Sequence, residues 1–563
     1  MIGQDWASGP RRLKLNWFLI LVVALGAFAL RAPRLGMRPM HTDEAVHADN
    51  FNRAFLERGV YRYDPHEYHG PTLNYFTLIP AWLTGARTYA QLTETTLRIV
   101  PVVFGTILVL LTVLLVDGLG LAAVLAAVLA ALSPALVFYS RYYIQEMLLV
   151  CFTFGVIACG YRYVRSRALP WAVAAGVFAG LMHATKETSI IAFGSMGLAL
   201  VLMTLAPRAR GRPIRPVGAG VKPLHLVLGL VIAVGVSALF YSAFGRHPRG
   251  VLDSYLTYAT YLGRGAGANT VHLHPWYYYL HTILYARYFD GPVWTEGAIV
   301  LLAVVGLAVA IKGDRTGSID IRLVRFLALY TVTMTIVYST VRYKTPWCLL
   351  SFLHGMILLA GVGAVTLLAW VKKPAGRVVV AALLAVTAGH LAFEAYRANF
   401  VYYADSRNPY VYAHTTPEIF TIVARVKEYV GLHGLGQSEE MPIQVAVEGN
   451  DYWPLPWYLR GLTVQWGNQI PAKVGPLILI SDKLEGALAQ RLYEDTPRQE
   501  QRMYLYLFDA PYYLWFRPGV KMLGFVRKCF RDELPQWQSE PAGAREGQRG
   551  QRGSDTADPV RGQ

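Results

Sequence analysis

The segment RPMHTDEAVHADN, Arg38–Asn50, directly follows the first apolar run of the chain, Trp17–Leu30, and decides how the rest of the sequence is interpreted. Adjacent carboxylates close to a bilayer surface are costly unless water, a cation or a substrate faces them. We therefore interpret Asp43 and Glu44 as the centre of an active site on the non-cytoplasmic side of a membrane. The alternative is that Asp43 only caps a surface helix that runs to about Arg58.

Composition places the chain among membrane proteins. Of its 563 residues, 54% are hydrophobic and 16% are charged, and the mean hydropathy is +0.32. Repeated long apolar runs are typical of a polytopic membrane protein. The net charge of +17 comes from short basic clusters between these runs, so we expect them to meet lipid headgroups and not nucleic acid. The four cysteines show no metal-binding or disulfide spacing.

Apolar runs predict about eleven transmembrane helices, if the first is an uncleaved helix and not a signal peptide. In the first helix we expect Arg31 and Arg34 to extend outward to the membrane surface. The predicted helices are residues 17–30, 97–116, 118–138, 145–164, 170–184, 188–206, 224–244, 294–312, 323–341, 347–371 and 377–397.

Lys and Arg residues give the orientation. They are concentrated in every second loop, apart from the tight Asp117-Gly118 hairpin. By the positive-inside rule the N-terminus is cytoplasmic and the C-terminus is external. The segments then predicted outside are loop 35–96, Ser140–Glu146, His183–Glu187, loop 246–292 and Arg342–Trp347.

The two long outer loops carry further signals. Loop 35–96 is too long to be without structure, and its apolar positions predict short interfacial helices after Asp43 and over Thr72–Leu83. Loop 246–292 is rich in tyrosine and contains His272, His274 and His281. These aromatic residues fit either an ordinary membrane-interface belt or a wall for a sugar or lipid substrate.

Four parts of the chain are expected. Residues 1–16 form a cytoplasmic N-terminus, residues 17–398 the transmembrane domain, residues 399–532 an external α/β domain and residues 533–563 a disordered tail. In the α/β domain we expect helices at Pro417–Tyr429 and Lys483–Tyr493, a helix or turn at Trp453–Tyr458, and strands at Ile443–Val447, Thr463–Trp466, Leu477–Ser481 and Arg502–Phe508. No glycine-rich phosphate loop follows these strands, so we interpret this domain as a binding or structural module.

Charged residues of both signs fall at the predicted outer helix ends. The acids are Asp43, Glu44 and Glu146, and the cations are Arg141, Lys186, Arg342 and Lys344. Structural alternatives exist: Arg141 and Lys186 as membrane anchors, Glu146 as a partner of a helix N-terminus, and Lys186 as a local partner of Glu187. Together they suit transfer from a phosphate-linked donor. A carboxylate takes the proton of an acceptor hydroxyl, and cations stabilise the charge on the leaving phosphate.

These motifs resemble those of the GT-C membrane glycosyltransferases, of the protein mannosyltransferase and aminoarabinose-transferase kind. The resemblance rests on Asp43-Glu44, on His69–Leu73, on Arg98–Pro101, on Arg141–Glu146 and on Thr185–Glu187. Tyr343–Trp347 and Tyr410–Pro417 extend it toward a prokaryotic subgroup known as flippase-activity-associated proteins.

The resemblance implies roles for particular residues. Asp43 would be the catalytic base with Glu44 as its neighbour, and Lys186 and Arg141 would hold the donor phosphate. Arg342 and Lys344 are assigned to the same phosphate, and His69, Glu146 and Glu187 to the substrate-adjacent shell. The oligosaccharyltransferase branch uses paired acids in the second outer loop to hold a divalent metal. Because Gln145-Glu146 offers only one acid, a Mg²⁺ or Mn²⁺ ion on Asp43 and Glu146 is left open.

The sequence thus predicts a cell-envelope enzyme that moves a sugar from a polyprenyl phosphate to a lipid, glycan or protein acceptor, with inversion. A transporter or flippase-associated protein without chemistry is the main alternative. The charges lie at helix ends and no internal repeat is evident, which favours an enzyme over a transporter. A receptor or scaffold that acts through the α/β domain is a third interpretation.

Overall fold

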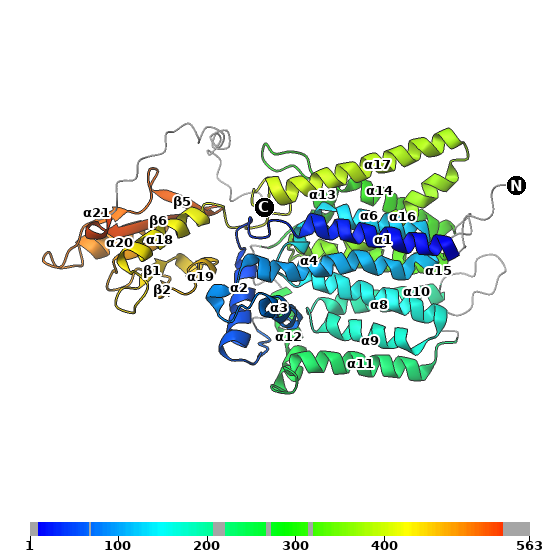
Figure 1. Ribbon diagram of the computed structural model, residues 1–563, viewed down its shortest axis with the longest axis horizontal. Coiled ribbons are helices and arrows are strands. Elements are labelled where there is room, and N and C mark those ends of the chain that lie inside the picture. The colour runs from blue at the N-terminus through cyan, green and yellow to red at the C-terminus, as the bar shows by residue number, and fades with distance from the viewer. Residues whose placement is uncertain (1–9, 67–68, 206–219, 266–271, 314–318, 533–563) are drawn as a thin grey trace. The chain divides into compact units, whose positions relative to one another are not determined.

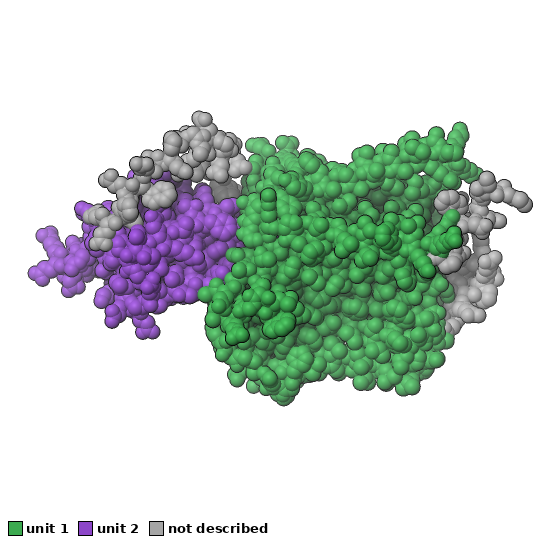
Figure 2. All heavy atoms as spheres, viewed as in Figure 1, with its two compact units in different colours: residues 1–37, 47–412 green, residues 38–46, 413–563 purple. Residues whose placement is uncertain are grey.

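A computed structural model describes residues 10–66, 69–205, 220–265, 272–313 and 319–532 of the chain. Figure 2 colours its two compact units. Unit 1 comprises residues 1–37 and 47–412, and unit 2 comprises residues 38–46 and 413–563. The division therefore falls at 412/413, later than the predicted boundary at 399. The predicted disordered tail and most of the predicted N-terminal segment lie outside the described residues.

Unit 1 is helical (Figure 1). Its elements, α2 beginning in the segment that belongs to unit 2, are α1 (Pro10–Arg31), α2 (Thr42–Phe51), η1 (Asn52–Glu57), α3 (Thr72–Leu83), η2 (Tyr89–Gln91), α4 (Glu94–Leu110), η3 (Leu111–Leu115), α5 (Val116–Leu119), α6 (Leu121–Leu132), α7 (Pro134–Ser140), α8 (Glu146–Ser166), α9 (Leu169–His183), α10 (Ser189–Leu205), α11 (Pro223–Tyr241), α12 (Arg249–Gly265), α13 (Tyr278–Leu284), α14 (Gly297–Lys312), α15 (Ile321–Thr340), η4 (Pro346–Leu349), α16 (Leu350–Trp370), α17 (Pro374–Tyr396) and η5 (Arg397–Val401).

Seven of the described helical segments are long and apolar enough to cross a membrane, or eight if the bent pair α6 and α7 is one span. The shorter apolar helices α9, α10 and α14 stand at three more of the predicted spans. The membrane-protein fold is therefore confirmed, and the number eleven stays a prediction. Helices α8 and α16 are the most buried spans, whereas α11 and α17 are mostly uncovered. In Figure 1, α9 lies between α8 and α11, and it packs against both.

The span predicted over residues 118–138 is broken in two. Helices α6 and α7 meet at an angle of 60° because Pro134 has no N–H to continue the α6 hydrogen bonds. Ser133 instead caps α7 by accepting from the N–H of Leu136 at 3.4 Å. The turn that precedes α6 is made at Gly120, whose φ is +56°, and not at the predicted Asp117-Gly118 hairpin.

Two arginines close the helix ends around this bend. The Arg31 guanidinium donates to the carbonyl groups of Ala130 and Ala131, both at 2.9 Å, at the end of α6. The expectation that Arg31 extends outward was wrong, because unsatisfied carbonyls at a helix C-terminus attract a cation. Arg141 does the same for α1, donating to the carbonyl groups of Arg31 at 2.6 Å and of Pro33 at 2.7 Å.

Unit 2 contains a mixed sheet with helices. The elements are α18 (Ile419–His433), β1 (Ile443–Ala446), η6 (Glu448–Asn450), α19 (Leu455–Tyr458), β2 (Val464–Gly467), β3 (Leu477–Ser481), η7 (Asp482–Leu484), α20 (Glu485–Tyr493), β4 (Tyr504–Tyr506), β5 (Tyr513–Arg517), β6 (Val520–Arg527) and α21 (Lys528–Asp532). The six strands are in the order β2-β1-β3-β6-β4, with β5 also paired to β6. Strand β1 is parallel to β2 and β3, and the pairs that involve β6 are antiparallel. Its core is built from buried residues such as Ile478, Ile480 and Leu488.

Candidate active site

A buried ion pair lies at one end of the helices of unit 1. The Lys186 ammonium, in the connection between α9 and α10, donates to the carboxylate of Glu146, the first residue of α8. Both side chains are buried. Cys348 in η4 lies close enough to both charges to interact with them electrostatically. A buried charge needs a partner, and Glu146 supplies it for Lys186.

Glu187, the next residue, faces a different set of groups. Its carboxylate accepts from His69 Nδ1 at 2.9 Å and from the Tyr63 hydroxyl at 3.4 Å. Burial raises the pKa of Glu187, but the His69 imidazole and the Lys186 charge more than offset burial, so the pKa lies below its usual value. The rings of His69 and His47 of α2 are 6.1 Å apart. The expected local pair of Lys186 with Glu187 is therefore not formed. Lys186 pairs with Glu146, and Glu187 pairs with His69.

Gly70 brings the first loop into contact with the α9–α10 connection. A Cβ atom at this position would overlap the carbonyl group of Ala184. The Thr72 N–H donates to the same carbonyl at 3.3 Å, and the hydroxyls of Thr72 and Thr185 are 2.8 Å apart. The absence of a side chain at residue 70 therefore allows His69 to reach Glu187.

A second cluster forms around Lys344. The backbone of Tyr343 pairs with that of Leu273, and the Lys344 ammonium donates to the carbonyl groups of Val341 and His274. Burial, with the nearby charge of Arg342, lowers the pKa of Lys344 below its usual value. Arg342 is exposed. The Nδ1 atom of His272 lies 2.6 Å from the Tyr412 hydroxyl. This cluster therefore joins two of the segments predicted outside, loop 246–292 and Arg342–Trp347.

The aromatic residues of loop 246–292 fall into two groups, exposed ones and ones packed near the predicted site residues. Trp276, Tyr277 and Tyr285 are half or more exposed, as a membrane-interface belt requires. Tyr278 instead stacks on His274 with ring centroids 4.1 Å apart, within the cluster around Lys344. Tyr255 and Tyr258 also pack against His183, with ring centroids 5.8 and 6.4 Å away, so the loop adjoins the predicted site residues at two places.

Arg141 lies close in sequence to Glu146, but its guanidinium group contacts other groups of the protein. Besides its bonds to the end of α1, its guanidinium lies over the ring of Phe400 at 4.6 Å. These contacts indicate that Arg141 positions the 141–146 segment. Its assignment to the donor phosphate stays a prediction.

Asp43 and Glu44 belong to the segment 38–46 and are described with unit 2. Glu44 is buried and its carboxylate accepts from the His41 N–H at 3.1 Å, which is the arrangement of a helix-capping glutamate. The Asp43 side chain is 42% exposed and lies 3.9 Å from His41. Glu44 therefore caps the N-terminus of α2, which is the role considered for Asp43 from the sequence.

The residues present do not favour a metal site. Among the described residues, no group of three or more His, Cys, Asp or Glu side chains could hold a metal ion. Glu146, the one acid of the second outer loop, is paired with an ammonium group, which competes with a cation for the same oxygens. The chemistry proposed below therefore uses no metal.

Several residues that support this site were not singled out from the sequence. Glu296, directly before α14, accepts from the Ala135 N–H at 2.9 Å, the Tyr410 hydroxyl at 2.7 Å and the Ser133 hydroxyl at 2.5 Å. It thereby holds the start of α7, which leads to the 141–146 segment. The only signal was an acidic residue inside a predicted span, which is costly without partners. Tyr143 is held in the same way by Thr77, at 2.7 Å.

Comparisons with known proteins agree with this architecture. Residues 75–248 match the family described as dolichyl-phosphate-mannose-protein mannosyltransferase. The crystal structure of ArnT from Cupriavidus metallidurans bound to undecaprenyl phosphate is similar, with 16% identity, coverage of 90% of this chain and 97% of that chain, and a TM-score of 0.59. The chain has the fold of a GT-C membrane glycosyltransferase. It is accordingly a multi-pass membrane protein.

A second GT-C structure extends the comparison. The archaeal oligosaccharyltransferase AglB from Archaeoglobus fulgidus, in complex with an inhibitory peptide and a dolichol-phosphate, shares 13% identity. That match covers 85% of this chain and 70% of that chain, with a TM-score of 0.53. No curated protein matches the chain. The finer resemblance to the flippase-activity-associated subgroup stays a prediction.

Proposed function

We propose that this protein transfers a sugar from a polyprenyl-phosphate donor to an acceptor at the external membrane surface, with inversion. The observation that carries the proposal is the buried Lys186–Glu146 pair beside Glu187 and His69. The Lys186 ammonium, at a helix end within a GT-C fold, is suited to bind the donor phosphate. The solved relatives bound to undecaprenyl phosphate and to a dolichol-phosphate support this donor class.

In the proposed reaction, an acceptor hydroxyl oxygen attacks the anomeric carbon of the sugar. The bond from that carbon to the phosphate oxygen breaks, and its electron pair leaves with the polyprenyl phosphate. Lys186, with Lys344 and Arg342, stabilises the phosphate charge. A cation about 4 Å from one phosphate charge contributes roughly 4 kcal/mol at an effective dielectric constant of 20.

Asp43 is the proposed base that takes the acceptor proton. It lies in the first turn of α2. The partly exposed carboxylate of Asp43 is available to solvent and substrate, in contrast to the buried carboxylate of Glu44.

The test compares Asp43→Asn with Asp49→Asn in a deletion strain. Asp49 is a matched control because it is a second carboxylate of α2, paired with Arg53 at 2.5 Å. Mass spectrometry of glycans and glycolipids should show a sugar that is lost on deletion and restored by the wild-type chain and by Asp49→Asn. Asp43→Asn should lower transfer by about 10²- to 10⁴-fold at equal protein levels in the membrane.

Two results would contradict the proposal. Restoration by Asp43→Asn would remove Asp43 as the base. If deletion changes no glycan, and the purified protein instead moves lipid-linked sugars across vesicle membranes, the transporter interpretation replaces the enzymatic one.

A further inference from the structure

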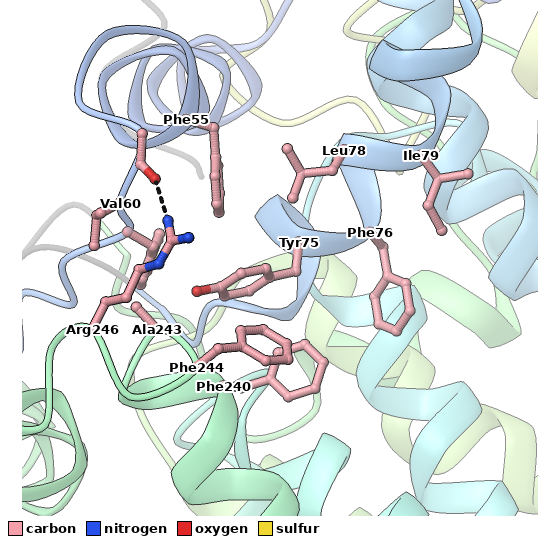
Figure 3. A pocket seen from close by; sticks show the side chains of 12 residues that line it. Phe55, Val60, Tyr75, Phe76, Leu78, Ile79, Phe240, Ala243, Phe244 and Arg246 are labelled. Carbon is pink, nitrogen blue, oxygen red and sulfur yellow. Dashed lines mark hydrogen bonds between the residues drawn. The ribbon is translucent and has the colours of Figure 1, made fainter.

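Unit 1 contains an apolar cavity of about 600 Å³ beside the candidate site. Figure 3 shows its side chains. They come from three elements: the π-helical turn η1 with the residues after it, helix α3, and the end of α11. The Tyr75 ring meets those of Phe55, Phe240 and Phe244 edge-on, with centroids 5.1 to 5.2 Å apart. Leu78 and Ile79 complete the apolar wall.

The lining does not suit water. A cavity of this size would hold about twenty water molecules at ~30 Å³ each. Each water needs two to four polar partners, and the lining is mostly aromatic and aliphatic. An apolar chain of about the same number of carbon atoms fits the space and the surface.

The cavity is open to the region of the bilayer. It lies at the end of α11, a candidate membrane span of which only 6% is buried in the protein. Ile79, Trp82 and Leu83 on α3 are exposed. An apolar chain can therefore enter from the lipid without crossing water.

One arginine lines the cavity, and three more line a neighbouring smaller cavity. Arg246 lines the larger cavity and donates to the Gly59 carbonyl at 3.3 Å, near the Tyr75 hydroxyl in Figure 3. Burial raises the pKa of Tyr75 to about 12, and the charge of Arg246 acts against this rise. Val60 lines both this cavity and a smaller one of about 40 Å³, which is also lined by Arg53, Arg58 and Arg62. Arg58 and Arg62 are exposed, so their guanidinium groups are available to an anion.

We propose that this cavity binds one acyl chain of an anionic bilayer phospholipid, with the headgroup phosphate against Arg246 and the arginines of the 53–62 segment. A bilayer phospholipid is favoured over the polyprenyl donor for two reasons. The cavity volume matches one acyl chain, whereas a polyprenyl carrier is much longer. The residues that line the cavity also do not include Lys186, where the donor phosphate is proposed. The inference does not depend on sugar transfer.

The occupant would bear directly on the candidate site. Tyr61 lines the cavity, and Tyr63, two residues on, contacts Glu187. A lipid chain that packs against Tyr61 would therefore hold the first loop in the position from which Tyr63 and His69 reach Glu187.

The test measures lipid binding to the purified full-length chain. Phosphatidylglycerol and phosphatidylcholine with identical acyl chains are compared by native mass spectrometry. The wild type should prefer phosphatidylglycerol by about tenfold, as one charge-assisted hydrogen bond predicts. Arg246→Gln should remove the preference, and Val60→Trp should weaken binding of both lipids. Arg249→Gln is the matched control, because Arg249 is exposed and lines neither cavity.

A photoactivatable phosphatidylglycerol, with a diazirine at the end of one acyl chain, locates the site without any substitution. It should label peptides that contain Tyr75 or Phe240, and unlabelled phosphatidylglycerol should suppress the labelling. Equal binding of both lipids, an Arg246→Gln variant that keeps the preference, or labelling elsewhere would overturn the proposal. Stronger suppression by a polyprenyl phosphate, together with loss of labelling in Lys186→Met, would assign the cavity to the donor instead.

Discussion

Lys186 and Glu146 neutralise each other in a buried position, so removing one should cost more than removing both. Lys186→Met should destabilise the protein by roughly 3–5 kcal/mol because it leaves a buried charge without its partner. The double variant Lys186→Met with Glu146→Gln should recover most of this loss in a thermal unfolding assay. It should not recover transfer, because the cation for the donor phosphate is still missing.

The double variant separates structure from chemistry. Full transfer in a stable double variant would show that Lys186 only neutralises Glu146. Lys186→Arg is the conservative control and should keep both the pair and part of the activity.

Lys344 should give donor binding a distinctive pH dependence. Its pKa is lowered by burial and by Arg342, so in the free protein the ammonium loses its proton at a lower pH than an ordinary lysine. Donor affinity should therefore be full at neutral pH and fall as the pH rises through this lowered value. Lys344→Arg should keep donor affinity at alkaline pH, since arginine stays protonated. Identical pH profiles of the two proteins, measured by donor titration, would exclude Lys344 from the phosphate site.

Sequence alone predicted which residues carry charge at the helix ends, but not how they pair. Glu146, Lys186, Glu187 and His69 were all singled out, and the structure brings these four together. The pairing of Lys186 with Glu146 was missed because it joins residues from different loops. Neighbours in sequence such as Lys186 and Glu187 point in different directions, so adjacency was a poor guide.

Gly70 shows how one backbone position controls two elements. Gly70→Ala places a methyl group against the Ala184 carbonyl and should displace the first loop from the α9–α10 connection. Overpacking of this kind costs about 1–3 kcal/mol, and transfer should fall along with the melting temperature. Gly36→Ala is the matched control, since nothing lies within 4 Å of a Cβ there. Equal behaviour of the two variants would show that the loop is not held at Gly70.

Secondary structure was predictable where hydropathy or periodicity is strong. Helix α3 has the predicted bounds Thr72–Leu83, and β3 the predicted bounds Leu477–Ser481. The break between α6 and α7 was missed although Ser133-Pro134 signals it, because the apolar composition continues across it. Strands β5 and β6 were also missed, despite the Pro518-Gly519 turn between them.

The membrane orientation rests on the distribution of basic residues and is testable on the whole molecule. Single cysteines at Arg342 and Lys373, both exposed positions, report on opposite ends of the bundle. In a Cys529→Ser background, an impermeant thiol reagent added to intact cells should label Arg342→Cys only. Lys373→Cys should react only after the membrane is opened. The reverse pattern would invert the topology and place the candidate site in the cytoplasm.

Unit 2 has one property with a consequence for biosynthesis. The short peptide 38–46 leaves the ribosome early, yet its partners in the same unit are synthesised last. The Met40 N–H donates to the Tyr458 hydroxyl at 2.8 Å, and the His41 ring lies 5.0 Å from that of His414. Since chains fold from the N-terminus as they are synthesised, this peptide must wait through the insertion of the whole helix bundle. A nonsense codon just before residue 413 would leave the bundle translated but Asp43 without its native surroundings.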